Sequence, residues 1–543
     1  MRSSVLRIGC AALSLSVAAA ALTSCSLMPP ASPLPDSRPA QTDAALPYDA
    51  ASLNDGRLRI LYSNSSNGGN TILCGSEVLY QASSSETVFL VPDTLTSTAR
   101  YYLRQWSDPS APTGRVSALY DRSGKEVLAF DQAYDAVLTG SLLVLTVPES
   151  MAYDPAHNHA PGDCRVIDLS TGEELTVPEN AYGCRIAGDA LAFNVCALPA
   201  DYIAPENDWD EDLTPYYAVQ VENRDGSVIS QAAGCAASPI STLAGDSAAP
   251  TDWLILDTYA EDGSMTGCRL YNPSTGEELS TDSYQYTGAG TVCLSRGGRY
   301  QLVDLVSTEQ SEVLCEFDEP VRYYAPGAAV TEPEVSASRG VQYTFHDLLT
   351  GDVKDLYDAS TDDATLAIYA TDGTVQVFDL QSGALLTDTV LDPVEGQTQA
   401  RVSPQGNGWA WVEQFDNDNY EDTAVQICGP EGARKTLDPA ALKERYDYYF
   451  PLLSTADGVY FYGAYNGPGN SWLYDVLDSS GQVVLSGLKS CVSYYSSGVN
   501  SLPEGVFAAV KGFRTGWMDL SGQWIYCESL FASASDEMTD NYF

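Results

Sequence analysis

Short apolar segments that alternate with turn-forming residues run through most of the chain. Segments such as 374–378 (TVQVF) and 482–485 (QVVL) are β-branched and are bounded by Gly, Asp or Ser. Such segments favour strands of four to eight residues joined by tight turns. Helical character is limited to 439–446 (PAALKERY), which we expect to be a loop insertion. Because parallel βαβ folds need a helix after nearly every strand, the pattern predicts an all-β protein.

One short motif recurs along these segments: β-rich residues, Asp or Asn, turn residues that include Gly, then β-rich residues again. Its best copies, 164–175 and 268–279, are identical at eight of twelve positions and lie 104 residues apart. Asp or Asn can bond its own backbone and Gly can supply a positive φ, so each copy predicts a tight β-hairpin. Weaker copies lie at 120–124, 222–226, 346–351, 378–383, 477–481 and 518–522, with degenerate ones at 303–304 and 428–432.

Spacings of mostly about 40 to 55 residues between the better copies suit four-stranded propeller blades. The chain resembles the WD40/quinoprotein-like propellers of bacterial lipoproteins. Residues 403–406 and 295–298 resemble the "SPDG" turn of such propellers, and 516–524 resembles a WG repeat. The resemblance implies one β-propeller over 55–543 with seven or eight four-stranded blades, because some blades would contribute two hairpins. Residues 57–62 could add a strand to the last blade, and two stacked β-domains are the rival fold.

The N-terminus divides into a basic, an apolar and a small-residue zone. Arg2 and Arg7 precede the apolar run 8–21, which suits a signal peptide and is short for a transmembrane helix of about 20 residues. Leu22-Thr23-Ser24-Cys25 resembles the lipobox of bacterial lipoproteins. In that family a diacylglyceryl group is attached to the cysteine and the chain is cut just before it. The resemblance therefore implies that residues 1–25 are a lipoprotein signal peptide and lipobox, with Cys25 as the lipidated residue.

Residues 26–54 are rich in Pro, Ala, Ser and Asp and have no hydrophobic period. Such a composition buries too little apolar surface to fold, so it predicts a disordered tether. We expect a protein that is lipid-anchored to a membrane and faces outside the cytoplasm, in an envelope that the lipobox does not identify. The stretch 533–543 is predicted to be a frayed tail.

Charge narrows the range of partners. The chain has 73 Asp and Glu against 27 Lys and Arg, a formal net charge of −46. Nucleic acid binding depends on basic side chains that neutralise phosphates, so this chain is not expected to bind nucleic acid. Anionic wall polymers are disfavoured for the same reason, whereas neutral ligands and cations remain compatible. Of the 13 cysteines, those of the mature chain are expected to be mainly buried apolar residues, with a few disulfides open.

Two acidic loops, 206–212 and 416–422, offer weak candidates for a Ca²⁺ site. Clustered carboxylate and amide oxygens suit Ca²⁺, although the Gly and distal Glu of an EF-hand are missing. The alternative is a pair of solvated insertions between strands, which we favour. No cofactor is expected otherwise. The weak Ca²⁺ candidates are Asp208, Asp210, Asp212, Asp416 and Asp418.

His157 and His159, with Asp163 or Cys164, could bind Zn²⁺, but a surface loop is the favoured reading. His346 is expected to be a half-buried strand residue. A further group of aromatic residues could line a carbohydrate or peptide site or pack between blades, and we favour packing. These residues are Trp209, Tyr216, Tyr217, Tyr446, Tyr448 and Tyr449.

Catalytic motifs are scarce. The sequence has three histidines and no nucleophile elbow, P-loop or dinucleotide motif. Residues 168–172 (DLSTG) resemble the repeat of quinoprotein dehydrogenases, but Thr176 and Ser280 stand where that family has a docking Trp, and its vicinal Cys pair is missing.

The sequence leaves three functional hypotheses. The leading one is a non-catalytic binding or scaffold module that presents a propeller face to a protein or glycan. The alternatives are a secreted hydrolase or lyase that uses carboxylates or tyrosines at the propeller axis, and a Ca²⁺-stabilised structural lipoprotein. A catalytic propeller should gather Asp, Glu, Tyr or His at its axial mouth, which separates the first two hypotheses.

Overall fold

In the computed structural model the chain falls into two regions, Met1–Leu46, which lies outside the described residues, and Pro47–Phe543. Cys25, the predicted tether apart from Leu53, and the predicted C-terminal tail lie outside the described residues. The described residues run from 53 to 529, except for 54, 63–68, 76, 97, 149–162, 197–215, 242–249, 261–263, 289, 307–310, 333–342, 363, 393, 395–396, 398, 417–420, 469–470 and 493–501.

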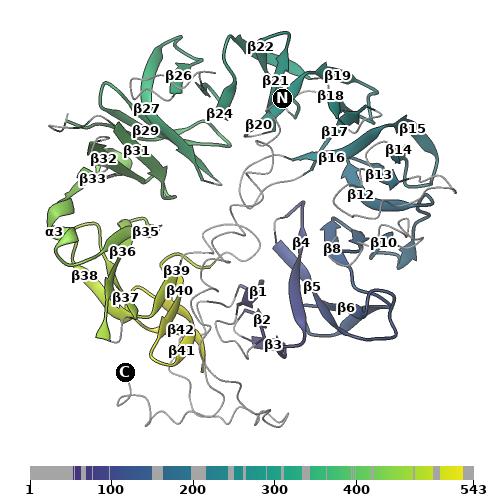
Figure 1. The fold of residues 1–543 in the computed structure, drawn as a ribbon, viewed down its shortest axis with the longest axis horizontal. Coiled ribbons are helices and arrows are strands. Elements are labelled where there is room, and N and C mark those ends of the chain that lie inside the picture. The colour runs from purple at the N-terminus through teal and green to yellow at the C-terminus, as the bar shows by residue number, and fades with distance from the viewer. Residues whose placement is uncertain are drawn as a thin grey trace. The chain divides into compact units, whose positions relative to one another are not determined.

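The second region is built from antiparallel β-sheets that follow one another in chain order (Figure 1). We number them as blades 1 to 11. Blade 1 has three strands, β1 Leu58–Leu61, β2 Thr71–Cys74 and β3 Glu77–Gln81. Blade 2 consists of β4 Thr87–Asp93, β5 Thr98–Ser107, β6 Arg115–Asp121 and β7 Glu126–Phe130, and blade 3 consists of β8 Asp135–Thr139, β9 Leu142–Thr146, β10 Cys164–Asp168 and β11 Glu173–Glu174. Blade 4 consists of β12 Ala181–Ala187, β13 Ala190–Cys196, β14 Tyr217–Glu222 and β15 Val228–Ala233, and blade 5 consists of β16 Cys235–Ser241, β17 Pro250–Tyr259, β18 Met265–Tyr271 and β19 Glu278–Thr281.

The remaining blades have the same four-stranded plan. Blade 6 consists of β20 Ser283–Gly288, β21 Thr291–Arg296, β22 Arg299–Asp304 and β23 Glu312–Phe317. Blade 7 consists of β24 Val321–Ala325, β25 Ala328–Thr331, β26 Tyr343–Asp347 and β27 Val353–Thr361. Blade 8 shares β27 with blade 7 and adds β28 Thr365–Ala370, β29 Thr374–Asp379 and β30 Leu385–Val390. Blade 9 consists of β31 Gln399–Pro404, β32 Ala410–Asp416, β33 Glu421–Cys428 and β34 Arg434–Leu437. Blade 10 consists of β35 Tyr448–Thr455, β36 Gly458–Asn466, β37 Trp472–Leu477 and β38 Val483–Leu488. Blade 11 consists of β39 Ser490–Val492, β40 Val506–Lys511, β41 Arg514–Asp519 and β42 Trp524–Ser529.

Two pairs of blades are joined through the backbone. A single parallel pairing, Asp93 with Leu138, connects β4 of blade 2 to β8 of blade 3. The strand β27 is shared, because its first half pairs with β26 and its second half, from Leu356 to Thr361, pairs with β28. It is therefore the last strand of blade 7 and the first strand of blade 8.

The recurring hairpin motif connects the third and fourth strands of a blade in all ten four-stranded blades, for example at 168–172 between β10 and β11. The prediction of all-β architecture with four-stranded antiparallel blades is confirmed. The predicted count of seven or eight blades is wrong, because it assumed that some blades carry two motifs. Each four-stranded blade instead carries one copy of the motif, although the copies at 303–304 and 428–432 are degenerate.

The turn residues act as the sequence predicts. In the turn after β41, the Asp519 carboxylate accepts hydrogen bonds from the backbone N–H groups of Ser521 and Gln523, both at 2.9 Å, and from the Ser521 hydroxyl at 2.7 Å. In the equivalent turn after β6, the bond from the Ser123 hydroxyl, followed by those from the Ser123 and Lys125 N–H groups, lowers the pKa of Asp121. The ionised carboxylate thus holds each turn closed.

Apolar side chains fill every junction between consecutive blades. The strand β28 shows how: Leu366, Ile368 and Ala370 pack into the junction with blade 7, and the alternate residues Ala367 and Tyr369 pack into the junction with blade 9. Each pair of consecutive blades shares one such cluster.

An eleventh cluster closes the circuit. Leu61 and Leu73 of blade 1 pack against Trp517 and Tyr526 of blade 11, and the Thr71 hydroxyl donates to Glu528 at 2.5 Å. The expectation that residues 57–62 add a strand to the last blade is wrong, since β1 pairs with β2 inside blade 1. Blade 11 already has four strands, so side chains rather than strand exchange join the two ends.

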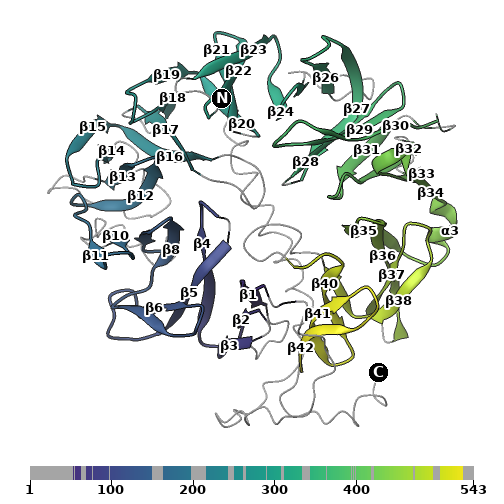
Figure 2. The ribbon, with the colours of Figure 1, turned by 180° about the vertical axis from the view of Figure 1, so that it is seen from behind.

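The predicted short helix is confirmed. It is α3 Pro439–Lys443, and it lies between β34 and β35 (Figure 2). Asp438 caps it by accepting from the backbone N–H of Ala440 at 2.9 Å, and Pro439 occupies the first turn, where no N–H donor is needed.

The cysteines behave mainly as buried apolar residues, as predicted. Nine of the eleven described cysteines are buried, for example Cys164 and Cys184 in the junction between blades 3 and 4. Burial raises the pKa of the Cys164, Cys428 and Cys491 thiols to about 12, so these thiols stay protonated.

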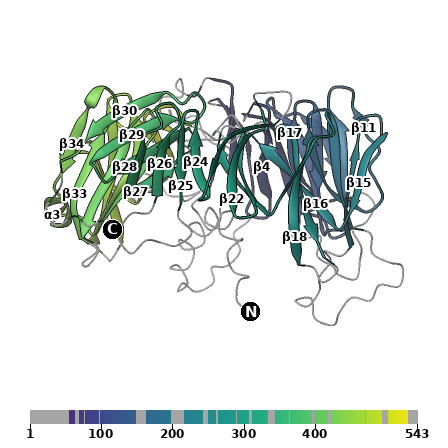
Figure 3. The same cartoon turned by 90° about the horizontal axis from the view of Figure 1, so that it is seen from above.

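The two ends of the blades differ. We call the end with the first-to-second and third-to-fourth connections the turn face, and the end where first and third strands begin the entry face; Figure 3 shows the strands side-on between them. On the turn face, neighbouring connections interlock. A Cβ at Gly383, in the Asp–Gly turn of blade 8, would collide with the backbone carbonyl of Pro326 in blade 7. The Leu348 N–H also donates to the Gly327 carbonyl at 2.9 Å.

This interlock predicts the effect of Gly383→Ala. Both Gly383 and Gly172 have a positive φ in an Asp–Gly turn, but a Cβ at Gly172 would meet nothing within 4 Å. Gly172→Ala should therefore cost only the left-handed backbone penalty of about 1–2 kcal/mol, and Gly383→Ala should cost clearly more. Urea unfolding of the two variants measures the difference. Equal losses would show that the turn face does not interlock in solution.

Candidate functional site

The histidine-containing segment and the two acidic segments each follow the second strand of a blade in the sequence. The connections from β9 to β10, from β13 to β14 and from β32 to β33 contain the two histidines and the two acidic loops, and each leads into a third strand. The residues Asp208, Asp210, Asp212, Asp418, His157, His159 and Trp209 lie outside the described residues.

The Ca²⁺ hypothesis therefore stays a prediction. Asp416 is the last residue of β32, and its side chain is not described. Within the described part of the chain, no group of three or more His, Cys, Asp or Glu residues is arranged to hold a metal ion.

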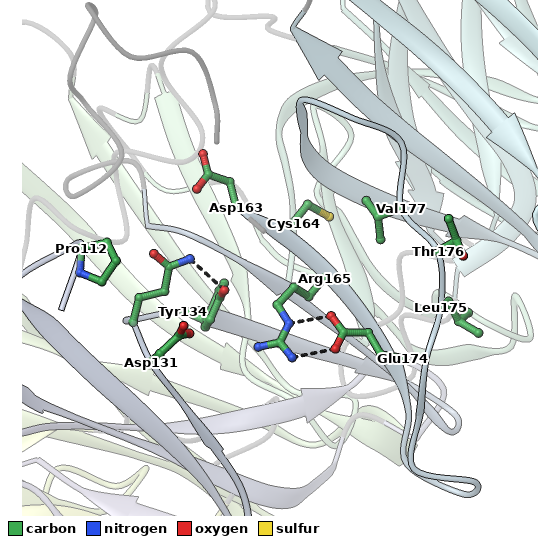
Figure 4. A pocket seen from close by; sticks show the side chains of 11 residues that line it. Pro112, Asp131, Tyr134, Asp163, Cys164, Arg165, Glu174, Leu175, Thr176 and Val177 are labelled. Atoms are coloured by element: carbon green, nitrogen blue, oxygen red, sulfur yellow. Dashed lines mark hydrogen bonds and ion pairs between the residues drawn. The ribbon is translucent and has the colours of Figure 1, made fainter. Parts of the chain in front are cut away.

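A groove of about 610 Å³ opens at the entry face between blades 2 and 3 (Figure 4). Its walls are the connection that leads into β6, the connection from β7 to β8, the start of β10, and the end of β11 with the residues that follow. The lining residues are Pro112, Asp131, Gln132, Tyr134, Asp163, Cys164, Arg165, Glu174, Leu175, Thr176 and Val177.

The centre of the groove is an ion pair between Arg165 of β10 and Glu174 of β11. Nε and Nη2 of Arg165 donate to the two carboxylate oxygens of Glu174, both at 2.7 Å. These bonds lower the pKa of Glu174 and raise that of Arg165, so both groups stay charged. The guanidinium also lies over the rings of Phe130 and Tyr134, at 5.6 and 5.9 Å. A bidentate pair supported by two rings holds the guanidinium in one orientation.

Tyr134 and Gln132 form the adjoining wall. The Gln132 amide donates to the Tyr134 hydroxyl at 2.8 Å, and the Tyr134 carbonyl accepts from the buried Gln105 side chain at 2.8 Å. Burial is the main cause that raises the pKa of Tyr134. This phenol therefore stays protonated and serves as a hydrogen-bonding group.

The ion pair also belongs to the repeat. Arg269 and Glu278, 104 positions further along, form the corresponding pair in blade 5 at 3.3 Å. The pair thus braces the third and fourth strands in both blades. Arg165 and Glu174 are part of the repeated motif 164–175, but they were not predicted as site residues. Nothing in the motif distinguishes this copy from the one at 268–279. Asp131, Gln132 and Tyr134 lie in a short connection that carries no motif.

A smaller hollow of about 210 Å³ lies beside the groove, between the first strands of the same blades. It is lined by Phe89, Leu90, Val91, Leu103, Asp135 and Ala136. Phe89 is 41% exposed there, and partial desolvation raises the pKa of the Asp135 carboxyl. Two hollows therefore lie at the junction between blades 2 and 3.

Tyrosines recur on the first strands, which lie on the inner side of the circuit in Figure 1. Most pair with another ring of the same blade: Tyr182 with Tyr217 at 5.5 Å between ring centroids, and Tyr323 with Tyr343 at 6.2 Å. Burial raises the pKa of Tyr182, and it raises that of Tyr343 to about 12. Phenols with raised pKa values are protonated at neutral pH, so these tyrosines are poor general bases.

The favoured reading that the sequence-selected aromatic residues pack between blades is confirmed for the buried ones. Tyr446 and Tyr449 belong to the junction between blades 9 and 10, and the Tyr446 hydroxyl donates to the buried Asp475 at 3.1 Å. Tyr448 is half-buried and lies 5.0 Å from the ring of Trp472, which is 40% exposed.

His346 is a half-buried residue of β26, as predicted. Its ring lies against Phe317 at 4.9 Å, and its Nε2 is 3.1 Å from the Thr331 hydroxyl. Desolvation lowers its pKa, which favours the neutral imidazole.

Asp358 is a first-strand carboxyl whose pKa is raised toward neutral pH, where acid–base chemistry needs it. It lies in the shared strand β27, and desolvation raises its pKa to about 6. Its Oδ2 accepts a hydrogen bond from the Val402 backbone N–H at 2.8 Å, so the carboxyl ties β27 to β31 of the next blade. The positive charge of Arg401 lowers the pKa of Asp358, and the negative charge of Glu413 raises it.

Comparisons with known proteins add little about function. A family model described as "Domain of unknown function (DUF5046)" matches residues 270–537, which span the end of β18, β19 and blades 6 to 11. The groove lies outside that match. No curated protein matches the chain.

Solved structures resemble the chain over much of its length at low identity. BamB from Moraxella catarrhalis has 11% identity and a TM-score of 0.28 over 70% of this chain and 92% of its own. An oligogalacturonate lyase in complex with manganese has 11% and 0.28, over 58% and 93%. The computationally designed Ika8 protein has 12% and 0.24, over 62% and 93%. None of these similarities assigns a ligand to this chain.

Within the part of the chain that the structure describes, no helix has the length and apolar character needed to cross a bilayer.

The raised pKa of Asp358 predicts how stability depends on pH. A carboxyl with a native pKa near 6, against an ordinary value of 3.8, takes up a proton in the folded state before the unfolded chain does. Stability from this group therefore rises as pH falls from about 7 to about 5. Asp358→Asn should remove that rise and leave the protein at pH 7 as stable as the parent or more so, by up to about 3 kcal/mol.

Urea unfolding at pH 5 and pH 7 tests this prediction. Asp355→Asn, at an exposed position of the same strand, is the matched control and should keep the parental pH dependence. A parental rise in stability in Asp358→Asn would show that another group causes the pH dependence.

Proposed function

We propose that this protein is a lipid-anchored, extracytoplasmic β-propeller that acts as a non-catalytic binding module, with the groove between blades 2 and 3 as its ligand site. The observation that carries the proposal is the groove of about 610 Å³ with a fixed ion pair at its centre. Its volume falls in the range of about 300–1,000 Å³ that is typical of small-molecule sites.

The groove is organised before any ligand arrives. Arg165 is held by Glu174 and by two aromatic rings, and Tyr134 is buried and bonded to Gln132. Side chains that are already ordered lose little conformational entropy on binding, so more of the interaction energy appears as affinity. The interlocked turn face supports the same role, because it gives the entry face a rigid base.

A binding role fits these groups better than acid–base catalysis. The tyrosines of the first strands have raised pKa values where a shift is resolved. The carboxyl with the most suitable pKa, Asp358, is occupied by the Val402 N–H. In the groove, Glu174 is held ionised by Arg165.

The membrane anchor is proposed from the sequence. Cys25 follows a lipobox-like Leu-Thr-Ser, and the Pro-rich segment 26–54 would hold the propeller away from the bilayer. Two acyl chains on Cys25 would give stable attachment, which a single chain does not.

Lipidation is tested by metabolic labelling with a fatty acid in a bacterial host that processes lipoproteins. The parent should incorporate the label, and Cys25→Ser should not. Cys10→Ser, which changes a cysteine of the apolar run, is the control and should still be labelled. Label in Cys25→Ser would contradict the assignment.

The groove is tested by filling it. Thr176 is an exposed lining residue, and Ser280 is its repeat equivalent in blade 5. Thr176→Trp should weaken binding of the region Pro47–Phe543 to bacterial cell-envelope fragments at least tenfold, whereas Ser280→Trp should not. Parental binding by Thr176→Trp, with unchanged thermal stability, would show that the ligand does not use this groove.

A further inference from the structure

The outer strand of blade 3 ends earlier than its repeat copy in blade 5. In blade 5, β19 pairs with β18 at four positions and reaches Cys268, which lies opposite Thr281. In blade 3, β11 pairs with β10 only at the two positions next to the Asp–Gly turn. Beyond them the Leu175 N–H donates to the Val166 carbonyl at 2.9 Å, and the ladder ends there. Cys164, the repeat equivalent of Cys268, therefore has no opposite residue on this edge among the described residues.

The sequence after β11 explains the difference. Position 178 is Pro in blade 3, and the equivalent position 282 is Asp in blade 5. Proline has no N–H and restricts the residue before it, so it favours the end of a strand. Residues 175–180 connect β11 to β12, whereas Asp282 alone connects β19 to β20. Within the longer connection, Val177 packs into the junction between blades 3 and 4 instead of pairing with β10.

This early end leaves the main chain of Cys164 facing the groove. The Val147 N–H donates to the Asp163 carbonyl at 2.9 Å, so Asp163 faces β9. Consecutive residues of a strand direct their N–H and C=O groups to opposite edges, so those of Cys164 face the outer edge. Cys164 lines the groove and is 2% exposed. Within the described residues, the segment 175–180 makes no hydrogen bond to the N–H or C=O of Cys164.

We infer that the groove takes an extended, basic peptide segment of a partner protein, which pairs with the open edge of β10; the inference rests on the proposed binding function. An open strand edge selects another strand, because the main-chain N–H and C=O groups of an added strand continue the ladder. The added segment takes the place that the end of β19 takes in blade 5. Arg165 keeps both of its bonds to Glu174 in such a complex, so no side-chain pair of the lining has to open.

Charge favours a basic segment. Asp131 is an exposed lining residue, and Asp163 lies next to Cys164 at the start of the open edge. The whole chain carries a formal charge of −46, so a cationic partner gains from both the local and the overall field. Side chains of a strand alternate between its two faces, so lysines at every second position would all point to the same side.

Hydrogen exchange of single amides tests whether the edge is open. In the region Pro47–Phe543 without a ligand, the Cys164 amide should exchange at least about tenfold faster than the Cys268 amide. Cys268 is the matched control, because it is the same residue type at the equivalent position of blade 5 and is paired there with Thr281. Equal protection of the two amides would show that this edge of β10 is already paired, and would overturn the inference.

Peptide pools test the ligand. The basic pool contains short peptides in which lysine alternates with valine, isoleucine, threonine or tyrosine. Glutamate replaces lysine in the acidic pool, and the third pool has the basic sequences with every peptide nitrogen methylated, which removes the N–H donors. We expect the basic pool to slow exchange of the Cys164 amide at least about tenfold and to leave the Cys268 amide unchanged. The acidic and the methylated pools should change neither amide.

Variants locate the effect. In Thr176→Trp the basic pool should no longer slow exchange of the Cys164 amide, because the new side chain fills the groove. In Ser280→Trp, the equivalent change in blade 5, the basic pool should slow it as in the parent.

The outcomes separate the inference from the proposed function. Equal slowing by the acidic or the methylated pool overturns the assignment of a basic strand. No slowing by any pool, while envelope binding still depends on Thr176, also overturns it and leaves the binding module standing. Envelope binding that does not depend on Thr176 removes the proposed site itself.

Discussion

Each sheet of this protein has two apolar faces, and both must be covered. In β28 all six residues are buried, and alternate side chains face the two neighbouring blades. Antiparallel sheets often leave one face to water, but here exposure of either face would forfeit about 1.5–3 kcal/mol for each large aliphatic side chain. A linear row of such blades would end in two uncovered faces. The circuit closes because blade 1 and blade 11 cover each other through Trp517 and Leu61.

Closure leaves the strand ends as the surfaces that can vary. The turn face is constrained by contacts between neighbours, such as Gly383 against Pro326. The connections of the entry face differ in length, from the two residues Gly297–Gly298 to the segment between β13 and β14. The groove arises where a short connection, 131–134, meets the repeat pair Arg165 and Glu174. A site of this kind therefore does not require a blade of unusual structure. It requires only that one connection between blades differs from the others.

The sequence predicted the strand chemistry well because each feature is local. The Asp–Gly turns, the capped helix at 439–443 and the half-buried His346 each follow from a few neighbouring residues. Blade number could not be obtained in the same way. Whether one blade holds one motif or two depends on which strands pair, and the shared strand β27 carries no residue that marks it as shared.

The candidate site was hidden for a related reason. Arg165 and Glu174 look the same as Arg269 and Glu278, and the difference between the two blades lies in what stands next to them. Those neighbours, Gln132 and Tyr134, lie in the connection from β7 to β8, about 30 residues before Arg165 in the sequence. The acidic loops were predicted as candidates from their composition, and composition does not indicate which side chains lie together in the fold.

The strand that two blades share sets how the circuit can come apart under load. At most junctions the blades are held by side chains, so each boundary can open without breaking a backbone ladder. Between blades 7 and 8, β27 is hydrogen-bonded on both sides, and the two blades form one seven-stranded sheet. A pull on either terminus would therefore part the circuit first at the side-chain contact between blades 11 and 1, next to the end that bears the proposed membrane anchor, and the seven-stranded sheet would resist as a single mechanical block.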